Sequence, residues 1–507
     1  MLTDRVQAEE LLEKALPVVE ARHSESWLVG GWVRDRLLGI ETHDLDFVVP
    51  AGAIATARVV ADSVGGDLVV LDKERDTARV LVGPPGHVIY LDFAALRAPS
   101  IEADLLARDF TVNAMAVRAA AWRAPEAAII DPAGGRRDLE RRLLRAVSVD
   151  SFREDPLRLL RAVRLRASLG FELEGGTARW IEQDAGLIDT VSRERVRDEL
   201  SLILAQVRPA DSLRLADALG LLGRVIPELK ALRTVPAAAG RPGSAWDHSL
   251  EAVEVADRLV RWLRGAEWGD DTWPAQMLTA ALAPYRLRLA QRMAQVLPGG
   301  HDVGVLLLMA ALLHDVGKGA GGGEDAGNGG RLLGHDVLGG SIAATVMRRL
   351  CFSGAETDHV RTTVSSHMRP GEMVQEMGPV PSERAIYRYY RDTGAAGVDT
   401  LLLSLADHWA TRGEGLEREH WRRHLALSRA LLEAYYERRE AIVEPPVLLD
   451  GHDLMVALGL APGPEVGELL ESIREAQAAG EVKSREEALA LARRLLESGG
   501  PLQAGSR

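Results

Sequence analysis

The pattern of apolar residues changes once along the 507-residue chain, near residue 140. Before that point, short apolar runs at 45–49, 67–72, 78–82 and 87–93 alternate with turn signals, as β-strands do. After it, Leu, Ala, Arg and Glu recur at helical spacing almost to the carboxyl end. We therefore expect an α+β protein, in which a small head with a mixed sheet is followed by a long all-α body.

Three segments interrupt the helical body. TVPAAAGRPGSA at 234–245 has the composition of a linker, GKGAGGGEDAGNGG at 317–330 that of a mobile loop, and Pro445-Pro446 that of a break before a last helical segment. These breaks predict four parts. They are a head at 1–140, a helical neck at 141–235, a larger helical domain at 236–440 and a helical tail at 441–507.

The charge of the chain points in two directions. The net charge of −13 argues against a nucleic-acid binder, but residues 134–166 contain ten Arg and no Lys against five acids. Folding could gather these arginines on one basic face, and a set of solvated helices fits the same composition. Charge alone leaves both interpretations open.

Other features bear on where the protein works. The single cysteine, Cys351, excludes a disulfide framework and fits a reducing compartment. The first twenty residues predict an amphipathic helix rather than a signal peptide. The longest apolar stretch, at 303–313, is too short to span a bilayer. We expect a cytoplasmic protein without a membrane partner.

Two carboxylates form the first candidate site. Asp44 and Asp46 stand two apart in a strand-like run, so both should project from one face while Leu45 and Phe47 enter the core. Convergent carboxylates suit Mg²⁺, which phosphoryl transfer uses to neutralise developing charge. An isolated pair of this kind is more often a set of exposed strand acids.

The neighbouring sequence strengthens the metal interpretation. WLVGGWVRDRLLG at 27–39 predicts a strand end, two glycines and a helix, an order that brings backbone N–H groups close to phosphate oxygens. Arg34 would add a charged fork for a triphosphate, although a tight turn explains the glycines equally well. Asp92, in another strand-like run, could complete a carboxylate triad or be an ordinary strand-end acid.

An ordered series of segments resembles one family. GGWVRD, DLDFVV, RDFTVNAMA (108–116), DPAGGRRDLERRLLRAV (131–147), FREDPLRLLRAVRL (152–165) and the tail at 448–493 are similar to class II CCA-adding tRNA nucleotidyltransferases and bacterial poly(A) polymerases. The resemblance implies tRNA, CTP and ATP as substrates, and Mg²⁺ on Asp44 and Asp46 with Asp92 as a further catalytic carboxylate. It also implies a set of nucleotide-binding residues: Gly30, Gly31, Arg34, Arg108, Asp109 and Asn113.

A polar stripe after residue 154 is a candidate base reader. It consists of Asp155, Arg158, Arg161 and Arg164. The Watson–Crick edges of C and A both offer an amine donor beside a ring-nitrogen acceptor, so Asp155 can accept from the amine while Arg158 donates to the ring nitrogen. G and U instead present a carbonyl and a ring N–H at these positions, so neither contact can form. The residues alone favour Asp155 as a helix cap before Pro156, or a capping box of Ser151 with Glu154, whereas the resemblance favours base reading.

A second set of candidate ligands lies in the helical body. His314-Asp315 closes an apolar helix, and the ordered set His248, His314, Asp315, His335, His367 and Asp407 resembles an HD phosphohydrolase domain. Histidine and carboxylate ligands suit Mn²⁺, Ni²⁺, Fe²⁺ or Mg²⁺ and water-activated phosphoester hydrolysis. A lone histidine in a helix is usually structural, and domains of this type often serve only as a scaffold.

Several functions remain open at this stage. Full CCA addition, CC addition alone and poly(A) addition compete, and only sixteen positions separate Asp92 from Arg108, which resembles members restricted to CC addition. The rival from another class is an HD phosphodiesterase with a nucleotide-binding head, which the paired Asp44 and Asp46 disfavour. A pure RNA-binding protein is disfavoured by the acidic net charge and by the two metal-type clusters.

Overall fold

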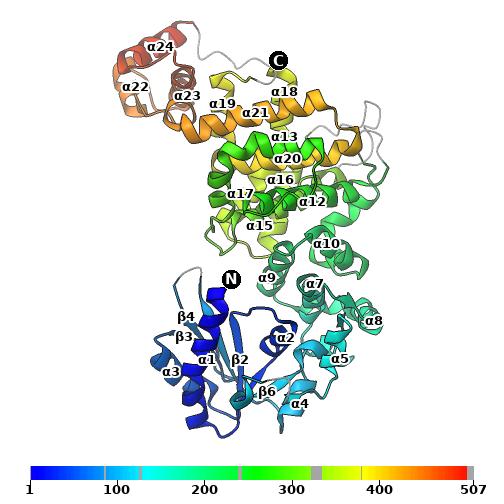
Figure 1. Ribbon diagram of the computed structural model, residues 1–507. Helices are drawn as coiled ribbons and strands as arrows, with labels where there is room; N and C mark the ends of the chain where they lie inside the picture. Colours follow the sequence, from blue (N-terminus) through cyan, green and yellow to red (C-terminus); the bar gives the residue numbers. More distant parts are fainter. Residues whose placement is uncertain are drawn as a thin grey trace. The chain divides into compact units, whose positions relative to one another are not determined.

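The computed structural model comprises two compact units (Figure 1). The first unit comprises Met1–Glu199 with Leu215–Val225, and the second comprises Leu200–Arg214 with Ile226–Arg507. The structure describes residues 2–84, 87–124, 128–237, 242–320, 334–377 and 380–498.

Within the described residues, the head carries a mixed seven-stranded sheet with the order β3-β4-β5-β2-β1-β6-β7. Its strands are β1 (Trp27–Val29), β2 (Asp44–Val49), β3 (Asp67–Asp72), β4 (Thr77–Val82), β5 (Ile89–Ala95), β6 (Ala116–Arg118) and β7 (Ile129–Ile130). β2 runs parallel to β5 and antiparallel to β1. The four strand-like runs are confirmed as β2 to β5, whereas β6 and β7 are too short to carry a period.

Helices cover this sheet and hold its central strands in place. α1 (Leu2–Arg22) packs on α3 (Ala53–Val64), and α3 in turn contacts β4 and β5. Every second residue of β2 faces these layers, so Leu45 and Phe47 are buried and Phe47 stacks on Phe93 with ring centroids 4.9 Å apart. This core fixes the opposite face of β2 and β5, where the carboxylates lie.

The rest of the first unit is mainly helical, which was predicted for the part beyond about residue 140. It contains α2 (Gly31–Leu38), α4 (Ile101–Leu106), α5 (Gly135–Glu140), α6 (Ser151–Glu154), α7 (Arg158–Leu169), α8 (Gly175–Asp184) and α11 (Leu222–Val225), with α9 (Arg193–Leu204) and α10 (Pro209–Ala218) crossing the division between the units. A small parallel pair, β8 (Leu143–Leu144) and β9 (Glu172–Leu173), lies within this helical part.

The second unit is built from helices around α15 (Val303–Leu313), which is buried along its whole length. The helices that pack around α15 or flank it are α12 (Ala245–Leu263), α13 (Trp273–Leu282), α14 (Arg286–Met293), α16 (His335–Arg349), α17 (Gly354–Ser365), α18 (Arg369–Met377), α19 (Glu383–Thr393), α20 (Gly397–Arg412) and α21 (Arg418–Glu437). The apolar run at 303–313 is therefore a core helix, as its length indicated.

The tail has an apolar core of its own. α22 (Gly451–Leu458), α23 (Pro464–Ala478) and α24 (Arg485–Glu497) enclose Leu454, Leu469 and Ile473. Three arginines of α19 pair with acids of the tail, and the bond from Arg388 to Glu475 is bidentate at 2.7 Å. These ion pairs connect the tail to α19.

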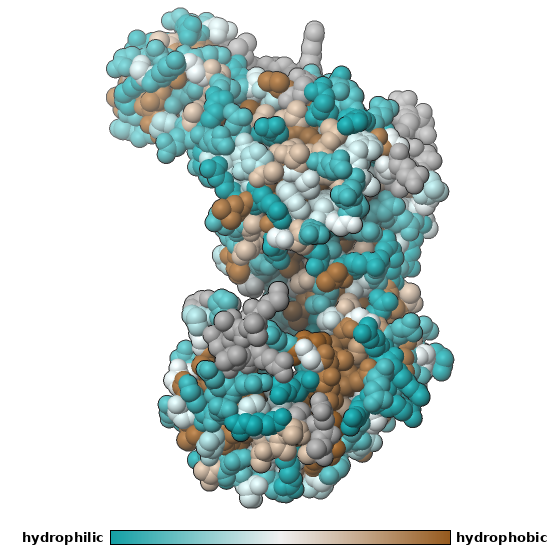
Figure 2. Space-filling view, viewed as in Figure 1, coloured by the Kyte–Doolittle hydropathy of each residue, from teal (hydrophilic) through white to brown (hydrophobic). Residues whose placement is uncertain are grey.

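Two of the predicted breaks, at 234–245 and at Pro445-Pro446, lie between helices, whereas the break at 317–330 begins inside a short 3-10 helix at Val316–Gly319. In the segment 234–245, Pro236 pairs with Ser244 as an isolated bridge, and 238–241 lie outside the described residues. Most of the glycine-rich run at 317–330, from 321 onward, also lies outside them, and Pro445-Pro446 falls between Val443 and α22. Most of the face drawn in Figure 2 is hydrophilic, with one larger apolar patch in the lower part of the view and other apolar residues scattered singly. Among the described helices, none combines the length and the apolar character needed to cross a membrane.

Candidate active site

The acidic side chains of the head lie in a row across neighbouring strands. The parallel register of β2 and β5 sets Asp46 beside Asp92, and Asp44 lies two residues before Asp46 on the same face. Burial, together with the charge of Asp92, raises the pKa of Asp46 to about 6. Burial and Asp92 also raise the pKa of Asp44. Ionising these groups together is therefore unfavourable without a cation, so the site fits a divalent metal.

The glycine turn lies against this row. Gly30 precedes α2 with φ 65°, a backbone conformation that favours glycine. A Cβ atom on Gly30 would lie 3.0 Å from Nη1 of Arg108 and 3.4 Å from Oδ2 of Asp46. On Gly31 it would lie 3.6 Å from both Asp46 and Arg34. The two glycines therefore keep the space between α2 and the carboxylates open, as an approaching phosphate requires.

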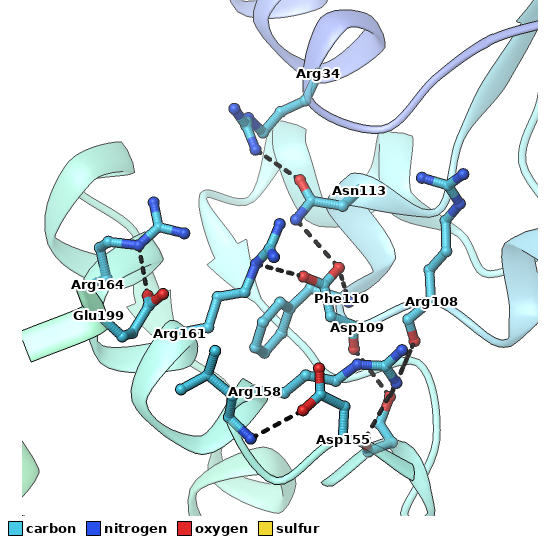
Figure 3. A network of polar contacts seen from close by, with 12 residues as sticks. Arg34, Arg108, Asp109, Phe110, Asn113, Asp155, Arg158, Arg161, Arg164 and Glu199 are labelled. Carbon is cyan, nitrogen blue, oxygen red and sulfur yellow. Dashed lines mark hydrogen bonds and ion pairs between the residues drawn. The ribbon is translucent and has the colours of Figure 1, made fainter. Parts of the chain in front are cut away.

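A polar network links the glycine turn to the neck (Figure 3). Nη1 of Arg34 donates to Oδ1 of Asn113 at 2.6 Å, and Nδ2 of Asn113 donates to Asp109 at 3.2 Å. Arg161 completes the chain with Nε 2.9 Å from Oδ2 of Asp109. Burial is the largest influence on the pKa of Asp109 and raises it, but Arg161, the Phe110 N–H and Asn113 together hold that pKa below its usual value. Asp109 is consequently an anion that orders its neighbours.

The candidate base-reading residues lie at the start of α7. Asp155 accepts the Leu157 N–H at 3.2 Å through Oδ1 and an N–H of Arg195 at 2.8 Å through Oδ2. Arg158 donates to the carbonyls of Ala107 at 3.0 Å and Ser151 at 3.1 Å. In this structure Arg158 therefore ties the chain around residue 107 to the neck.

The two capping predictions have different outcomes. The contact of Asp155 with Leu157 caps the turn that leads into α7, although α7 itself begins only at Arg158. The capping box of Ser151 with Glu154 is wrong, because the Ser151 hydroxyl donates to the carbonyl of Arg108 at 2.9 Å. Arg164, the last residue of the stripe, pairs with Glu199 on α9.

Sequence reasoning missed the partners that hold these residues. Arg79 on β4 donates from Nε and Nη2 to the two oxygens of Asp92, both at 2.7 Å. Arg195 and Glu199 on α9 hold Asp155 and Arg164. The one available signal was that Arg79 is the only charged residue in the apolar strand TARVLV. Nothing local marked the other two.

The six ligand-type residues of the second unit come together in one cluster. Overlapping triads have their ligand atoms within 4.8 Å of one another: His248 with His314 and Asp315, His314 with His367 and Asp407, and Asp315 with His335 and His367. Nε2 of His248 lies 3.1 Å from Nε2 of His314 and 2.9 Å from Oδ1 of Asp407. We call these six residues the HD cluster.

The hydrogen bonds of the HD cluster select the metal-binding tautomer. Nδ1 of His314 lies 2.8 Å from the Ala311 carbonyl, and Nδ1 of His367 lies 2.7 Å from the Val364 carbonyl. A carbonyl accepts only a protonated nitrogen, so each Nε2 presents its lone pair to the centre when the ring is neutral. Burial, with the neighbouring His314, lowers the pKa of His367 to about 4. Burial lowers the pKa of His314, but Asp315 and Asp407 outweigh it and raise that pKa above its usual value, so a metal would displace a proton from this ring. Imidazole and carboxylate groups together fit a divalent transition metal.

Models of known families match most of the chain. They are the "Poly A polymerase head domain" at residues 26–145, the "Probable RNA and SrmB- binding site of polymerase A" at 170–232, the "HD domain" at 287–411 and the "tRNA nucleotidyltransferase domain 2 putative" at 429–492. The fold and the carboxylate site thus define a nucleotidyltransferase that also carries an HD domain.

Curated relatives match nearly end to end. An A-adding tRNA nucleotidyltransferase of Deinococcus radiodurans is 35% identical over 93% of this chain and 95% of its own. A CC-adding tRNA nucleotidyltransferase of Geobacter sulfurreducens is 32% identical over 95% of each chain. A solved CCA-adding enzyme in complex with ATP shares the fold at 23% identity, with a TM-score of 0.60 over 99% of this chain and 98% of that one. The chain belongs to the class II CCA-adding tRNA nucleotidyltransferase family.

Proposed function

We propose that this enzyme adds C residues from CTP to tRNA that lacks its CCA end, and stops before the final A. The observation that carries the nucleotidyl transfer is the row of Asp44, Asp46 and Asp92 beside the glycine turn and the amino terminus of α2. The restriction to C is supported by the connection from β5 to Arg108, which holds only the short helix α4. Relatives named for A addition and for CC addition match at similar identity, 35% and 34%, so similarity does not choose between them.

In this proposal, Asp44 and Asp46 hold Mg²⁺, which when bound neutralises phosphate charge and favours ionisation of the attacking 3′-hydroxyl. Asp92 supports them as the third carboxylate. The triphosphate lies against the open N–H groups of α2, and Arg34 supplies a cationic fork. The remaining nucleotide contacts come from Arg108, Asp109 and Asn113, with Arg161 and Arg164 extending the basic side of the pocket.

Base selection is assigned to Asp155 and Arg158. The carboxylate of Asp155 accepts from the exocyclic amine that C and A share, and Arg158 donates to the adjacent ring nitrogen. Nη1 and Nη2 of Arg158 donate to backbone carbonyls, but a guanidinium has five N–H groups, so Arg158 can contact a base while it stays bonded to Ala107. That attachment would couple base recognition to the segment around Arg108.

The parts of the chain divide the work in this proposal. The head at 1–140 carries the chemistry, the neck at 141–235 reads the base and binds RNA, and the tail at 441–507 binds tRNA. The domain at 236–440 contains the HD cluster. The protein would act in the cytoplasm, which agrees with its having a single cysteine, Cys351.

The decisive experiment supplies each NTP separately to tRNAs that end before CCA, after the first C and after the second C. We expect CTP to extend the first two substrates with Mg²⁺ present, and ATP to extend none. Extension of the third tRNA by ATP would instead establish A addition. Asp44→Asn and Asp46→Asn should each lower extension by at least about a hundredfold while the fold is retained. Near-normal turnover in either variant would exclude the metal assignment.

A second candidate function belongs to the HD cluster. The specific observation is that backbone carbonyls orient His314 and His367 with Nε2 toward the buried Asp315 and the half-buried Asp407. We propose that the cluster binds Mn²⁺, Ni²⁺, Fe²⁺ or Mg²⁺ and hydrolyses a phosphoester with a metal-activated water. Hydrolysis of a 2′,3′-cyclic nucleotide or of bis(p-nitrophenyl) phosphate, measured with each metal in turn, tests this activity.

A further inference from the structure

Arg79 lies in the same row as the candidate catalytic carboxylates. The antiparallel register of β4 and β5 sets Arg79 opposite Asp92, and the parallel register of β5 and β2 sets Asp92 opposite Asp46. Residues directly opposite one another in a sheet share a face. The guanidinium therefore stands at one end of the row, with Asp92 between it and Asp46.

The contact between Arg79 and Asp92 is a two-point clamp. Nε and Nη2 each donate to a different carboxylate oxygen at 2.7 Å. The guanidinium also lies 4.8 Å from the centroid of the Tyr90 ring, which further fixes its position. A planar fork of this kind fits a carboxylate with both geometry and charge, so the pair is close to neutral as a unit.

The other two carboxylates of the row are in a different situation. Within the described part of the chain, neither Asp44 nor Asp46 has a side-chain hydrogen bond or ion pair. The row therefore contains two unpartnered carboxylates and one whose oxygens are already occupied. A cation that enters the site meets two free anionic ligands and a neutralised third.

We propose that Arg79 is a positioning residue that reserves Asp92: by clamping both of its oxygens, it confines the divalent metal to Asp44 and Asp46 in the nucleotide-free enzyme and sets the affinity of that site. This inference rests on the proposed function, since it takes Asp44 and Asp46 as the metal-binding pair. The net charge of the Arg79 and Asp92 unit decides how strongly the site attracts a cation.

Mn²⁺ binding to the nucleotide-free, full-length protein, followed by electron paramagnetic resonance, tests the proposal without reference to turnover. Arg79→Gln leaves Asp92 with a net negative charge, and we expect Mn²⁺ to bind about tenfold more tightly. Asp92→Asn leaves an uncompensated guanidinium, and binding should weaken about tenfold. Combining Arg79→Gln with Asp92→Asn makes the net charge of the two side chains zero again, so this double variant should have the wild-type affinity for Mn²⁺. Arg79→Lys, which keeps the positive charge, should have it as well.

Two further variants keep the outcome clear. Arg79→Met preserves the aliphatic stem beside Tyr90 and should give the same tightening if Arg79→Gln folds poorly. Asp44→Asn identifies the Mn²⁺ of the head, because the HD cluster contributes the same background in every protein. If Asp44→Asn loses no Mn²⁺, the proposed metal site itself fails. If Asp44→Asn loses it but Arg79→Gln and Arg79→Met leave the affinity within twofold or weaken it, only the role of Arg79 is overturned.

Discussion

Nε of Arg161 on α7 lies 2.9 Å from Oδ2 of Asp109, in the segment between α4 and the turn at 111–113. Asp109 also accepts from the Phe110 N–H and from Asn113, and Asn113 in turn accepts from Arg34. One buried carboxylate therefore links a neck helix to the residue beside the glycine turn. Positions on both sides of the candidate nucleotide site depend on it.

Replacing Asp109 with Ala should disturb both stability and nucleotide binding. The change leaves Arg161 and Asn113 without their shared acceptor, which we expect to cost about 2 kcal/mol of unfolding free energy. CTP affinity should fall about tenfold, since Arg34 and Arg161 are no longer held in place. Chemical denaturation and calorimetric titration with CTP measure the two effects. Asp150→Ala, at an exposed acid of the neck, is the control, and an unchanged CTP affinity in Asp109→Ala would contradict the linkage.

The base-reading role of Asp155 is separable from its role as a cap. If Asp155 accepts from the exocyclic amine, Asp155→Ala should reduce the ratio of CTP to UTP incorporation by about tenfold to a hundredfold. If it only caps the turn at Leu157, stability should drop by about 1 kcal/mol and the ratio should stay constant. Competition assays with both nucleotides, beside melting curves, distinguish the two.

Arg195→Ala is the matched control for this experiment. It removes the partner of Oδ2 of Asp155 but retains the carboxylate. Its CTP to UTP ratio should therefore remain near that of the wild type. A ratio that changes equally in both variants would mean that the ion pair, rather than the acceptor, governs selection.

The HD cluster should function independently of nucleotide addition. Each of the three triads contains His314, Asp315 or both, so combining His314→Ala with Asp315→Ala disrupts all of them. We expect loss of the bound transition metal by elemental analysis and loss of phosphodiesterase activity, with CTP addition within twofold of the wild type. Asp358→Ala, at an exposed acid of α17, should change none of these. Loss of addition in a folded double variant that still binds tRNA would show that the two sites are coupled.

His424 on α21 should make the second unit sensitive to mild acid. Burial, with the neighbouring His408 and His420, lowers the pKa of His424 to about 3, and Nε2 lies 3.4 Å from the Ser404 hydroxyl. An unfolded chain protonates this ring near pH 6.5, whereas the folded protein does not, so the unfolded state binds more protons between about pH 6.5 and 3. His424 should therefore contribute a loss of stability that approaches about 1.4 kcal/mol for each pH unit well below 6.5.

His424→Asn tests this assignment. The variant lacks the titrating ring, so the slope of unfolding free energy against pH between about 6.5 and 5 should decrease by about the amount assigned to one proton. The same substitution at the exposed His452 should keep the wild-type slope. Equal slopes in His424→Asn and the wild type would remove His424 as the source.

Local pattern was enough for most of the fold. Alternation placed Leu45 and Phe47 in the core with Asp44 and Asp46 opposite, and the run at 67–72 coincides with β3. The glycine pair before α2 was equally visible, because a positive φ at Gly30 is a local requirement. Strands of two or three residues, such as β6 and β7, could not be recognised, because so few residues cannot show an alternation of apolar and polar side chains.

By itself the sequence determined the mixed head, the helical body, the spacing of the paired carboxylates and the order of the ligand-type residues in the HD cluster. The tertiary structure decided what those residues contact. Arg79 donates two hydrogen bonds to Asp92, Arg195 donates to Asp155, and Arg158 donates to backbone carbonyls. The physical reason is the distance along the chain over which each kind of information acts. Periodicity and turn chemistry depend on neighbours a few residues away. Arg195 contacts Asp155, 40 positions away, only because packing brings α9 alongside the start of α7.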